Sequence, residues 1–184
     1  MIILIIVVVL IVLTAIWFVS TRNSMIGSRN TVDEAWSGID VQLKRRHDLV
    51  PNLVETVKGY ATHEQKVFEE TTLARAEAMK AGSIAATQEA EAKLSGALTD
   101  LRAVAEQYPD LRATENFQQL QRDLSEIEDE IQASRRIYNS NVQSYNTKIQ
   151  VFPNSIVAGM GNFGDRDFFE IGDAAEREPV QVKF

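Results

Sequence analysis

Hydrophobic and polar positions divide the chain into an uncharged apolar start and a long region with helical periodicity. Residues 1–19 are apolar except for Thr14, and the first charged side chain is Arg22. Nineteen helical residues span about 28 Å, close to the roughly 30 Å hydrocarbon core of a bilayer. In lipid, an isolated segment satisfies its backbone polar groups only as a helix. The pattern therefore predicts that residues 1–21 form a transmembrane helix in contact with the lipid bilayer.

A cleaved signal peptide is the alternative for this segment. Signal peptides carry a basic start, a shorter apolar stretch and small residues before the cleavage point. Here no basic residue precedes the apolar stretch, and bulky Trp17-Phe18-Val19 occupy the expected cleavage zone, which favours an anchor. Since Arg22 and Arg29 follow the span, the positive-inside rule favours a cytoplasmic soluble domain with the N-terminus outside. The expected location is the cell (inner) membrane, crossed once.

From residue 32 onward, apolar residues recur every three or four positions, the period of an amphipathic helix. The stripe consists of Val32, Trp36, Ile39, Leu43, Val50, Leu53, Val57, Tyr60, Val67 and Ala74. The pattern reaches about Lys80, where Ala81-Gly82-Ser83 offers a helix end and then an N-cap. Pro51 lies inside this pattern and predicts a kink, or a helix break if the chain reverses there.

Two further helices follow in the pattern. One covers about residues 84–107 and ends at Tyr108-Pro109. The other carries a seven-residue apolar repeat, which predicts left-handed coiled-coil packing against neighbouring helices. Its repeat positions are Phe117, Leu124, Ile131, Tyr138, Tyr145 and Phe152, and Pro153 ends it.

These elements predict an all-α protein. A transmembrane helix (1–21) is followed by an elongated antiparallel helical bundle (22–152) of three long helices, or four if Pro51 breaks the first. An irregular C-terminal tail (153–184) follows and is expected to dock on the bundle. Within this tail, glycines interrupt the periodicity, and residues 180–184 alternate as in a short strand or extended segment.

The predicted lengths leave part of the first helix without a partner. A first helix of about 50 residues is roughly 75 Å long, and a second of about 24 residues is roughly 36 Å long. The stripe of Val32, Trp36, Ile39 and Leu43 therefore needs another cover. The tail folding back, association between copies, or a chain reversal at Pro51 are the three alternatives.

Composition narrows the function. The 184 residues carry a net charge of −7 and no Cys, which excludes disulfides, Cys-based zinc sites and thiol nucleophiles. The acidity argues against nucleic-acid binding, which requires a basic face. The excess lies in residues 76–130, with 5 basic and 12 acidic side chains. We interpret it as a solvated helix face, with an acidic docking surface as the alternative.

No catalytic, cofactor-binding or metal-binding group is expected. His63-Glu64 resembles the start of a zinc-binding H-E-x-x-H motif, but Val67 occupies the second histidine position. We expect both His47 and His63 to face solvent or to cap helices.

Two patches are candidates for interaction instead. In residues 42–48, three consecutive basic residues could meet an acidic partner, but pairing along the helix, as between Asp40 and Lys44, fits the spacing better. Around Tyr138 and Tyr145, core packing is the main alternative. The candidate interaction residues are Trp36, Ile39, Leu43, Lys44, Arg45, Arg46, Arg135, Arg136, Tyr138 and Tyr145.

Three blocks of sequence carry a family resemblance. Residues 29–64 read RNTVDEAWSGIDVQLKRRHDLVPNLVETVKGYATHE. A second block has Glu115-Asn116-Phe117, Arg135-Arg136, Tyr138-Asn139 and Tyr145-Asn146, and a third has Phe152-Pro153, Phe168-Phe169-Glu170 and Val182-Lys183-Phe184. Together they resemble the LemA family of bacterial membrane-anchored proteins. Arg22-Asn23 stands where that family usually has Tyr-Asn.

The resemblance implies one N-terminal transmembrane helix, a helical bundle in the cytoplasm and no established enzyme activity. We therefore expect a non-enzymatic membrane-anchored scaffold that forms homo-oligomers and does not bind nucleic acid. Genes of the family often neighbour those of membrane proteases. An accessory subunit or adaptor of a membrane protease or envelope-stress system, with a membrane protein as partner, is therefore the alternative.

Overall fold

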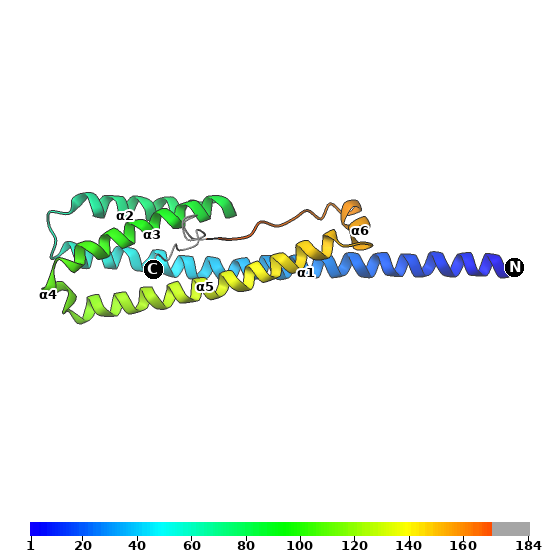
Figure 1. The fold of residues 1–184 in the computed structure, drawn as a ribbon, viewed down its shortest axis with the longest axis horizontal. Coiled ribbons are helices and arrows are strands. Elements are labelled where there is room, and N and C mark those ends of the chain that lie inside the picture. Colours follow the sequence, from blue (N-terminus) through cyan, green and yellow to red (C-terminus); the bar gives the residue numbers. More distant parts are fainter. Residues whose placement is uncertain (171–184) are drawn as a thin grey trace, which may run out of the picture. The chain divides into compact units, whose positions relative to one another are not determined.

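The computed structural model describes residues 1–170, and within that range it contains helices and no strands, which confirms the all-α prediction. Figure 1 shows the helices in chain order. They are α1 (Ile2–Lys58), α2 (Gln65–Ala78), α3 (Ile84–Glu106), α4 (Pro109–Arg112), α5 (Glu115–Gln150) and α6 (Asn154–Met160). The expected extended segment at residues 180–184 lies outside the described residues.

Helix α1 continues through Pro51 and ends at Lys58, so the prediction of one helix from about residue 30 to Lys80 was wrong. The break comes at residues 59–64, where the backbone N–H groups of Tyr60 and Ala61 both bond to the carbonyl of Val57. Ala61 is fully buried in the turn that follows. The described part of the chain therefore has four longer helices, α1, α2, α3 and α5, as in the four-helix alternative. The first division lies at residues 59–64, however, and not at Pro51.

The expected N-cap at Ser83 is confirmed. Its hydroxyl oxygen accepts a hydrogen bond from the backbone N–H of Ala86 at 3.2 Å, which satisfies one of the free donors at the start of α3. Helix α3 then runs to Glu106, one residue short of the predicted end, and buries Leu94, Leu98 and Leu101.

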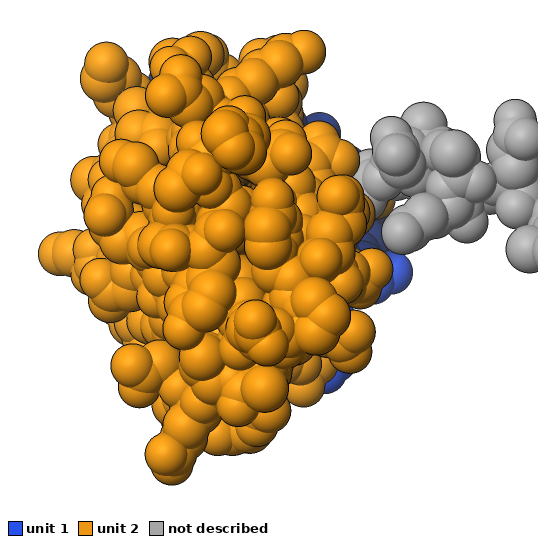
Figure 2. Space-filling model, turned by 90° about the vertical axis from the view of Figure 1, so that its left-hand side faces the viewer, with its two compact units in different colours: residues 1–38, 136–168 blue, residues 39–135, 169–184 orange. Residues whose placement is uncertain are grey.

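The chain forms two compact units, shown in different colours in Figure 2. Unit 1 comprises residues 1–38 and 136–168, and unit 2 comprises residues 39–135 together with the described residues after 168. The core of unit 2 is apolar and joins all of its helical segments. Its members include Val50, Leu53, Val57, Phe68, Leu94, Leu98, Leu101, Leu111, Phe117 and Leu124.

The heptad of α5 is buried at five of its six positions. Phe117, Leu124, Ile131, Tyr138 and Tyr145 all lie in the interior, as the repeat predicts. Phe152 was expected to continue the series but follows the end of α5, and 81% of its surface is exposed. The buried heptad therefore ends one repeat earlier than the sequence indicates, although Ile149 near the end of α5 is also buried.

In unit 1, the chain after α5 turns back. Helix α6 buries Val157 and Ala158, and the following non-helical residues bury Phe163. We call residues 163–168 the closing segment. Residues 154–160 of the expected irregular tail are therefore helical, while the closing segment is irregular, as predicted.

The expected open stripe on the first helix does not exist. Val32, Ile39 and Leu43 are buried within the chain, and Trp36 is half-buried. The length argument failed because it considered only the second helix as a cover. In unit 1, Tyr138 on α5 packs against Trp36, a cover that none of the three alternatives named, while the closing segment contacts α1 beside the stripe, at Arg29 and Asp33.

Candidate functional site

Arg46 and His47 lie in the interior of unit 2, where both contact the fully buried carboxylate of Glu91 on α3. One oxygen of Glu91 lies 3.1 Å from Arg46 Nη1, and the other lies 2.5 Å from His47 Nε2. We call Arg46, His47 and Glu91 the buried charge cluster. Because both carboxylate oxygens have a partner, the cluster avoids most of the desolvation cost of an isolated buried charge.

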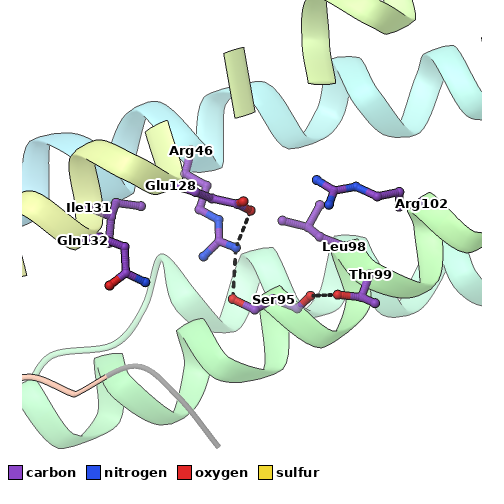
Figure 3. Close-up of a pocket in the computed structure, with 8 residues that line it drawn as sticks. All are labelled: Arg46, Ser95, Leu98, Thr99, Arg102, Glu128, Ile131 and Gln132. Atoms are coloured by element: carbon purple, nitrogen blue, oxygen red, sulfur yellow. Dashed lines mark hydrogen bonds and ion pairs between the residues drawn. The ribbon is translucent and has the colours of Figure 1, made fainter. Parts of the chain in front are cut away.

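Arg46 also reaches an open pocket between α1, α3 and α5 (Figure 3). Its Nη2 donates to Ser95 Oγ at 3.0 Å and lies 3.5 Å from Glu128 Oε1, and its buried Nε has no hydrogen-bond partner. The pocket is lined by Arg46, Ser95, Leu98, Thr99, Arg102, Glu128, Ile131 and Gln132. The Ser95 and Thr99 hydroxyls both donate to carbonyls one turn earlier on α3, so their protons are already engaged.

The predicted basic patch is thus divided between interior and surface. Lys44 and Arg45 are exposed, and Arg45 donates to Gln42. Arg46 and His47 are buried, so the expectation of a solvent-facing His47 was wrong, whereas His63 is exposed as expected. Sequence reasoning missed Glu91, which lies on an alanine-rich helix 45 residues beyond Arg46.

Tyr138 and Tyr145 are core residues of unit 1. The ring of Tyr138 meets Trp36 edge-on at a centroid distance of 5.4 Å, and its hydroxyl donates to the carbonyl of Asp167 at 2.8 Å. Burial raises the pKa of the Tyr138 hydroxyl, although nearby Arg166 acts in the opposite direction. Burial likewise raises the pKa of Tyr145. The packing alternative therefore describes their environment.

The closing segment is held by side-chain hydrogen bonds from α5. Asn146 accepts from the backbone N–H of Arg166 and donates to its carbonyl, both at 2.9 Å. The Arg166 guanidinium in turn lies 2.9 Å from Asp33 on α1. In the sequence, Asn146 stands out only as the neighbour of the heptad residue Tyr145. Arg166 belongs to no apolar period and to no motif, so its role could not be predicted.

The two remaining candidates, Arg135 and Arg136, lie on α5. Arg135 donates to the Gln132 side chain, and Arg136 is exposed. Among residues 1–170, no group of three or more His, Asp or Glu side chains is arranged to hold a metal ion. The described polar clusters are therefore held together by hydrogen bonds and ion pairs within the chain.

Fold and site together define a helical bundle attached to a long apolar N-terminal helix. Among the described helices, α1 is the one long and apolar enough to cross a membrane, and none of its most apolar stretch is buried within the chain. The sequence profile of the LemA family matches residues 35–184, and the chain belongs to that family.

Three similar proteins agree with the assignment to this family. Protein LemA of Metamycoplasma hominis is 28% identical over 90% of this chain and 74% of its own length. Magnetosome protein MamQ 2 of Paramagnetospirillum magneticum is 26% identical over 86% and 70%. Magnetosome protein MamQ of Magnetospirillum gryphiswaldense is 24% identical over 86% and 69%. The chain is thus a LemA-type membrane-associated protein.

Proposed function

We propose that this protein is a non-enzymatic, single-pass scaffold that holds a helical bundle at the inner membrane. The observation that carries the proposal is the continuity of α1, which joins an exposed apolar stretch to residues that pack inside both units. A helix without a break between anchor and bundle serves to position the bundle and not to carry out a reaction. The saturated hydrogen bonding of the Glu91 carboxylate supports a structural role for the buried charge cluster.

The bundle is assigned to the cytoplasm. Arg22 and Arg29 follow the apolar stretch on the bundle side. The positive-inside rule places such a side in the cytoplasm. Because the chain has no Cys, a single Leu73→Cys substitution on the exposed surface of α2 gives a unique label.

In intact cells, a membrane-impermeant maleimide is expected to leave the Leu73→Cys variant unlabelled until the inner membrane is permeabilised. Labelling before permeabilisation would place the bundle outside. A single Cys in a periplasmic protein serves as the positive control for access.

Self-association is the interaction we propose for the scaffold, through the exposed part of the basic patch. Lys44 and Arg45 are solvent-exposed, whereas Ile39, Leu43 and Arg46 are buried and unavailable. The acidic side chains of residues 76–130 supply charges of opposite sign on a second copy.

Site-specific crosslinking in membranes tests this interaction. A photo-crosslinking amino acid at position 44 is expected to yield homodimers, and the same probe at exposed Leu73 is the control. Adducts only with a foreign membrane protein would overturn self-association in favour of an adaptor role. No adducts at position 44 above the level at position 73 would overturn both.

A further inference from the structure

The junction of α5 and α6 carries an exposed apolar patch that the fold does not use. Val151, Phe152, Ile156 and Met160 have exposed fractions between 45% and 81%, and we call these four side chains the apolar corner. On its other side, α6 buries Val157 and Ala158 against unit 1. The junction is therefore folded, and the exposure is confined to one face.

The chain around the corner is also free of charge. No Asp, Glu, Lys or Arg occurs between Lys148 and Asp165. Soluble surfaces normally intersperse charged side chains among apolar ones, so an exposed apolar face in such a stretch marks a contact surface.

Contacts within unit 1 fix where the corner lies along α1. Tyr138 packs on Trp36, and ten residues later Lys148 Nζ donates to Ser24 Oγ at 3.3 Å and also to Ser28. Helix α5 therefore runs antiparallel to α1, as Figure 1 shows. Helix α5 continues two residues beyond Lys148 to Gln150, about 3 Å farther toward the N-terminus of α1, and Phe152 follows in the turn.

The corner is thereby level with about residues 20–24 of α1, where the apolar stretch ends. Val19 is the last apolar residue of the span, and Ser20, Thr21 and Arg22 follow. A bilayer that contains residues 1–19 has its headgroup region at this level. Asn154 Nδ2 donates to the carbonyl of Lys148 at 3.2 Å, which holds the turn that presents Phe152.

We propose that the apolar corner inserts into the interfacial region of the bilayer beside the anchor. Phe152, Ile156 and Met160 enter the boundary between headgroups and acyl chains, where amphipathic segments bury their apolar faces. Arg22 lies at this level and Lys148 about one helical turn farther from the span, and both cations suit anionic headgroups. Unit 1 then has two membrane contacts, the anchor and the corner, which restrict the tilt of this unit. The proposal rests on the single-pass anchor proposed above.

Fluorescence quenching in liposomes tests the proposal with the full-length chain. Phe152→Cys and Met160→Cys are labelled with the environment-sensitive dye NBD in vesicles of phosphatidylethanolamine and phosphatidylglycerol. Ile137→Cys is the matched control, because Ile137 is 60% exposed on α5, 15 residues before Phe152 and about 20 Å from the corner along the helix. Val12→Cys reports on the anchor.

Lipids with a shallow spin label are expected to quench the dye at positions 152 and 160 about twofold or more over position 137. Aqueous iodide is expected to show the reverse order. Equal iodide quenching at 137, 152 and 160, with Val12→Cys shielded, would overturn the corner contact and leave the anchor standing. Iodide access at position 12 would overturn the anchor itself.

A second variant separates lipid contact from contact with another copy. Phe152→Asp combined with Met160→Asp is expected to restore iodide access to a dye on Ile156→Cys, while circular dichroism shows unchanged helix content. Shielding at position 156 that disappears on dilution into excess lipid, without quenching by spin-labelled lipid, would assign the corner to a protein contact and overturn the proposal.

Discussion

Glu91 is a residue whose importance depends entirely on its partners. Its carboxylate is fully buried and bonded to Arg46 and His47. Glu91→Ala leaves both partners in the interior without an acceptor, and removing one member of a buried pair costs about 3–5 kcal/mol. We expect that loss in the free energy of unfolding, measured by urea denaturation in detergent.

Glu89 provides the matched control on the same helix. It is exposed and pairs with Lys93 at 2.9 Å across one helical turn. Exposed pairs of this kind contribute little, so Glu89→Ala is expected to leave the unfolding midpoint nearly unchanged. Equal effects of the two substitutions would contradict a structural role for the buried charge cluster.

The tyrosines of unit 1 predict sensitivity to alkali. Burial raises the pKa of Tyr138 and Tyr145 above that of the unfolded chain, which is about 10. Each group therefore contributes stability that is fully present below pH about 10. That contribution is lost as the pH rises through the raised folded-state pKa, because the unfolded chain ionises first.

We expect the wild-type unfolding midpoint to fall above pH about 10, and Tyr138→Phe to reduce that fall. At neutral pH the same variant loses the bond to Asp167, worth about 1 kcal/mol. Tyr60→Phe, at a largely exposed ring, is the control. Phenolate absorbance at high pH measures the ionisation directly.

At the residue scale, the sequence indicated which residues are candidates but not which of them are buried. The run Lys44-Arg45-Arg46 is visible in the sequence, but periodicity alone did not tell which of its cations is buried. That depends on Glu91, a partner 45 positions away that lies among alanines and has no local signal. Tyr138 and Tyr145 were predictable because the heptad itself places them in the core.

Among the helices, α1 shows how a proline is accommodated. Pro51 has no N–H to donate to the carbonyl of His47, one turn earlier. Arg75 on α2 supplies the donor instead, with its Nε 2.6 Å from that carbonyl oxygen. Pro51 thus leaves the carbonyl of His47 without a backbone donor, and the hydrogen bond from Arg75 to this carbonyl links α2 to α1.

A double-mutant cycle tests this substitution of donors. Arg75→Ala is expected to cost about 1.5–3 kcal/mol, the range for hydrogen bonds to charged groups. In the Pro51→Ala background the backbone N–H can serve the same carbonyl, so the cost of Arg75→Ala is expected to fall by about 1 kcal/mol. Additive effects would show that Arg75 acts independently of the proline.

Helix ends were predicted where a residue type marks them. Ser83 marks the start of α3, which was found where expected, whereas Pro109 was predicted only to end that helix, and the short helix α4 that begins there was not predicted. The end of α1 was missed because the apolar period continues across residues 59–64 through Tyr60 and Val67. Apolar periodicity shows which side of a helix is apolar. It does not reveal a turn when the apolar residues recur at the same spacing on both sides of that turn.

For the whole molecule, we predict that membrane attachment depends on residues 1–21. An Asp at the centre of a transmembrane helix costs about 2.5–3.5 kcal/mol. We expect Val8→Asp combined with Ile11→Asp to shift the protein from the carbonate-resistant membrane fraction toward the soluble fraction. Asn23→Asp, beyond the span, is the control and is expected to stay in the membrane fraction.

The all-α class and the anchor were predictable because both follow from periodicity and length. The segments that cover the first helix could not be predicted in the same way. The closing segment has neither an apolar period nor a motif, and it is held by single contacts such as that of Asn146 with the Arg166 backbone. Such pairings between distant parts of a chain depend on three-dimensional complementarity.

The division of unit 1 into residues 1–38 and 136–168 has a consequence for biosynthesis. The first part leaves the ribosome about 100 residues before the second, an interval of about 5 to 20 seconds at 5–20 residues per second. During that interval the part of α5 that completes unit 1 and all of α6 have not been synthesised, while residues 1–21 are already available to the insertion machinery. If residues 1–21 are the anchor proposed above, their insertion therefore precedes closure of unit 1, and a delay in translation between residues 38 and 136 prolongs the time that the first part of this unit stays without the second.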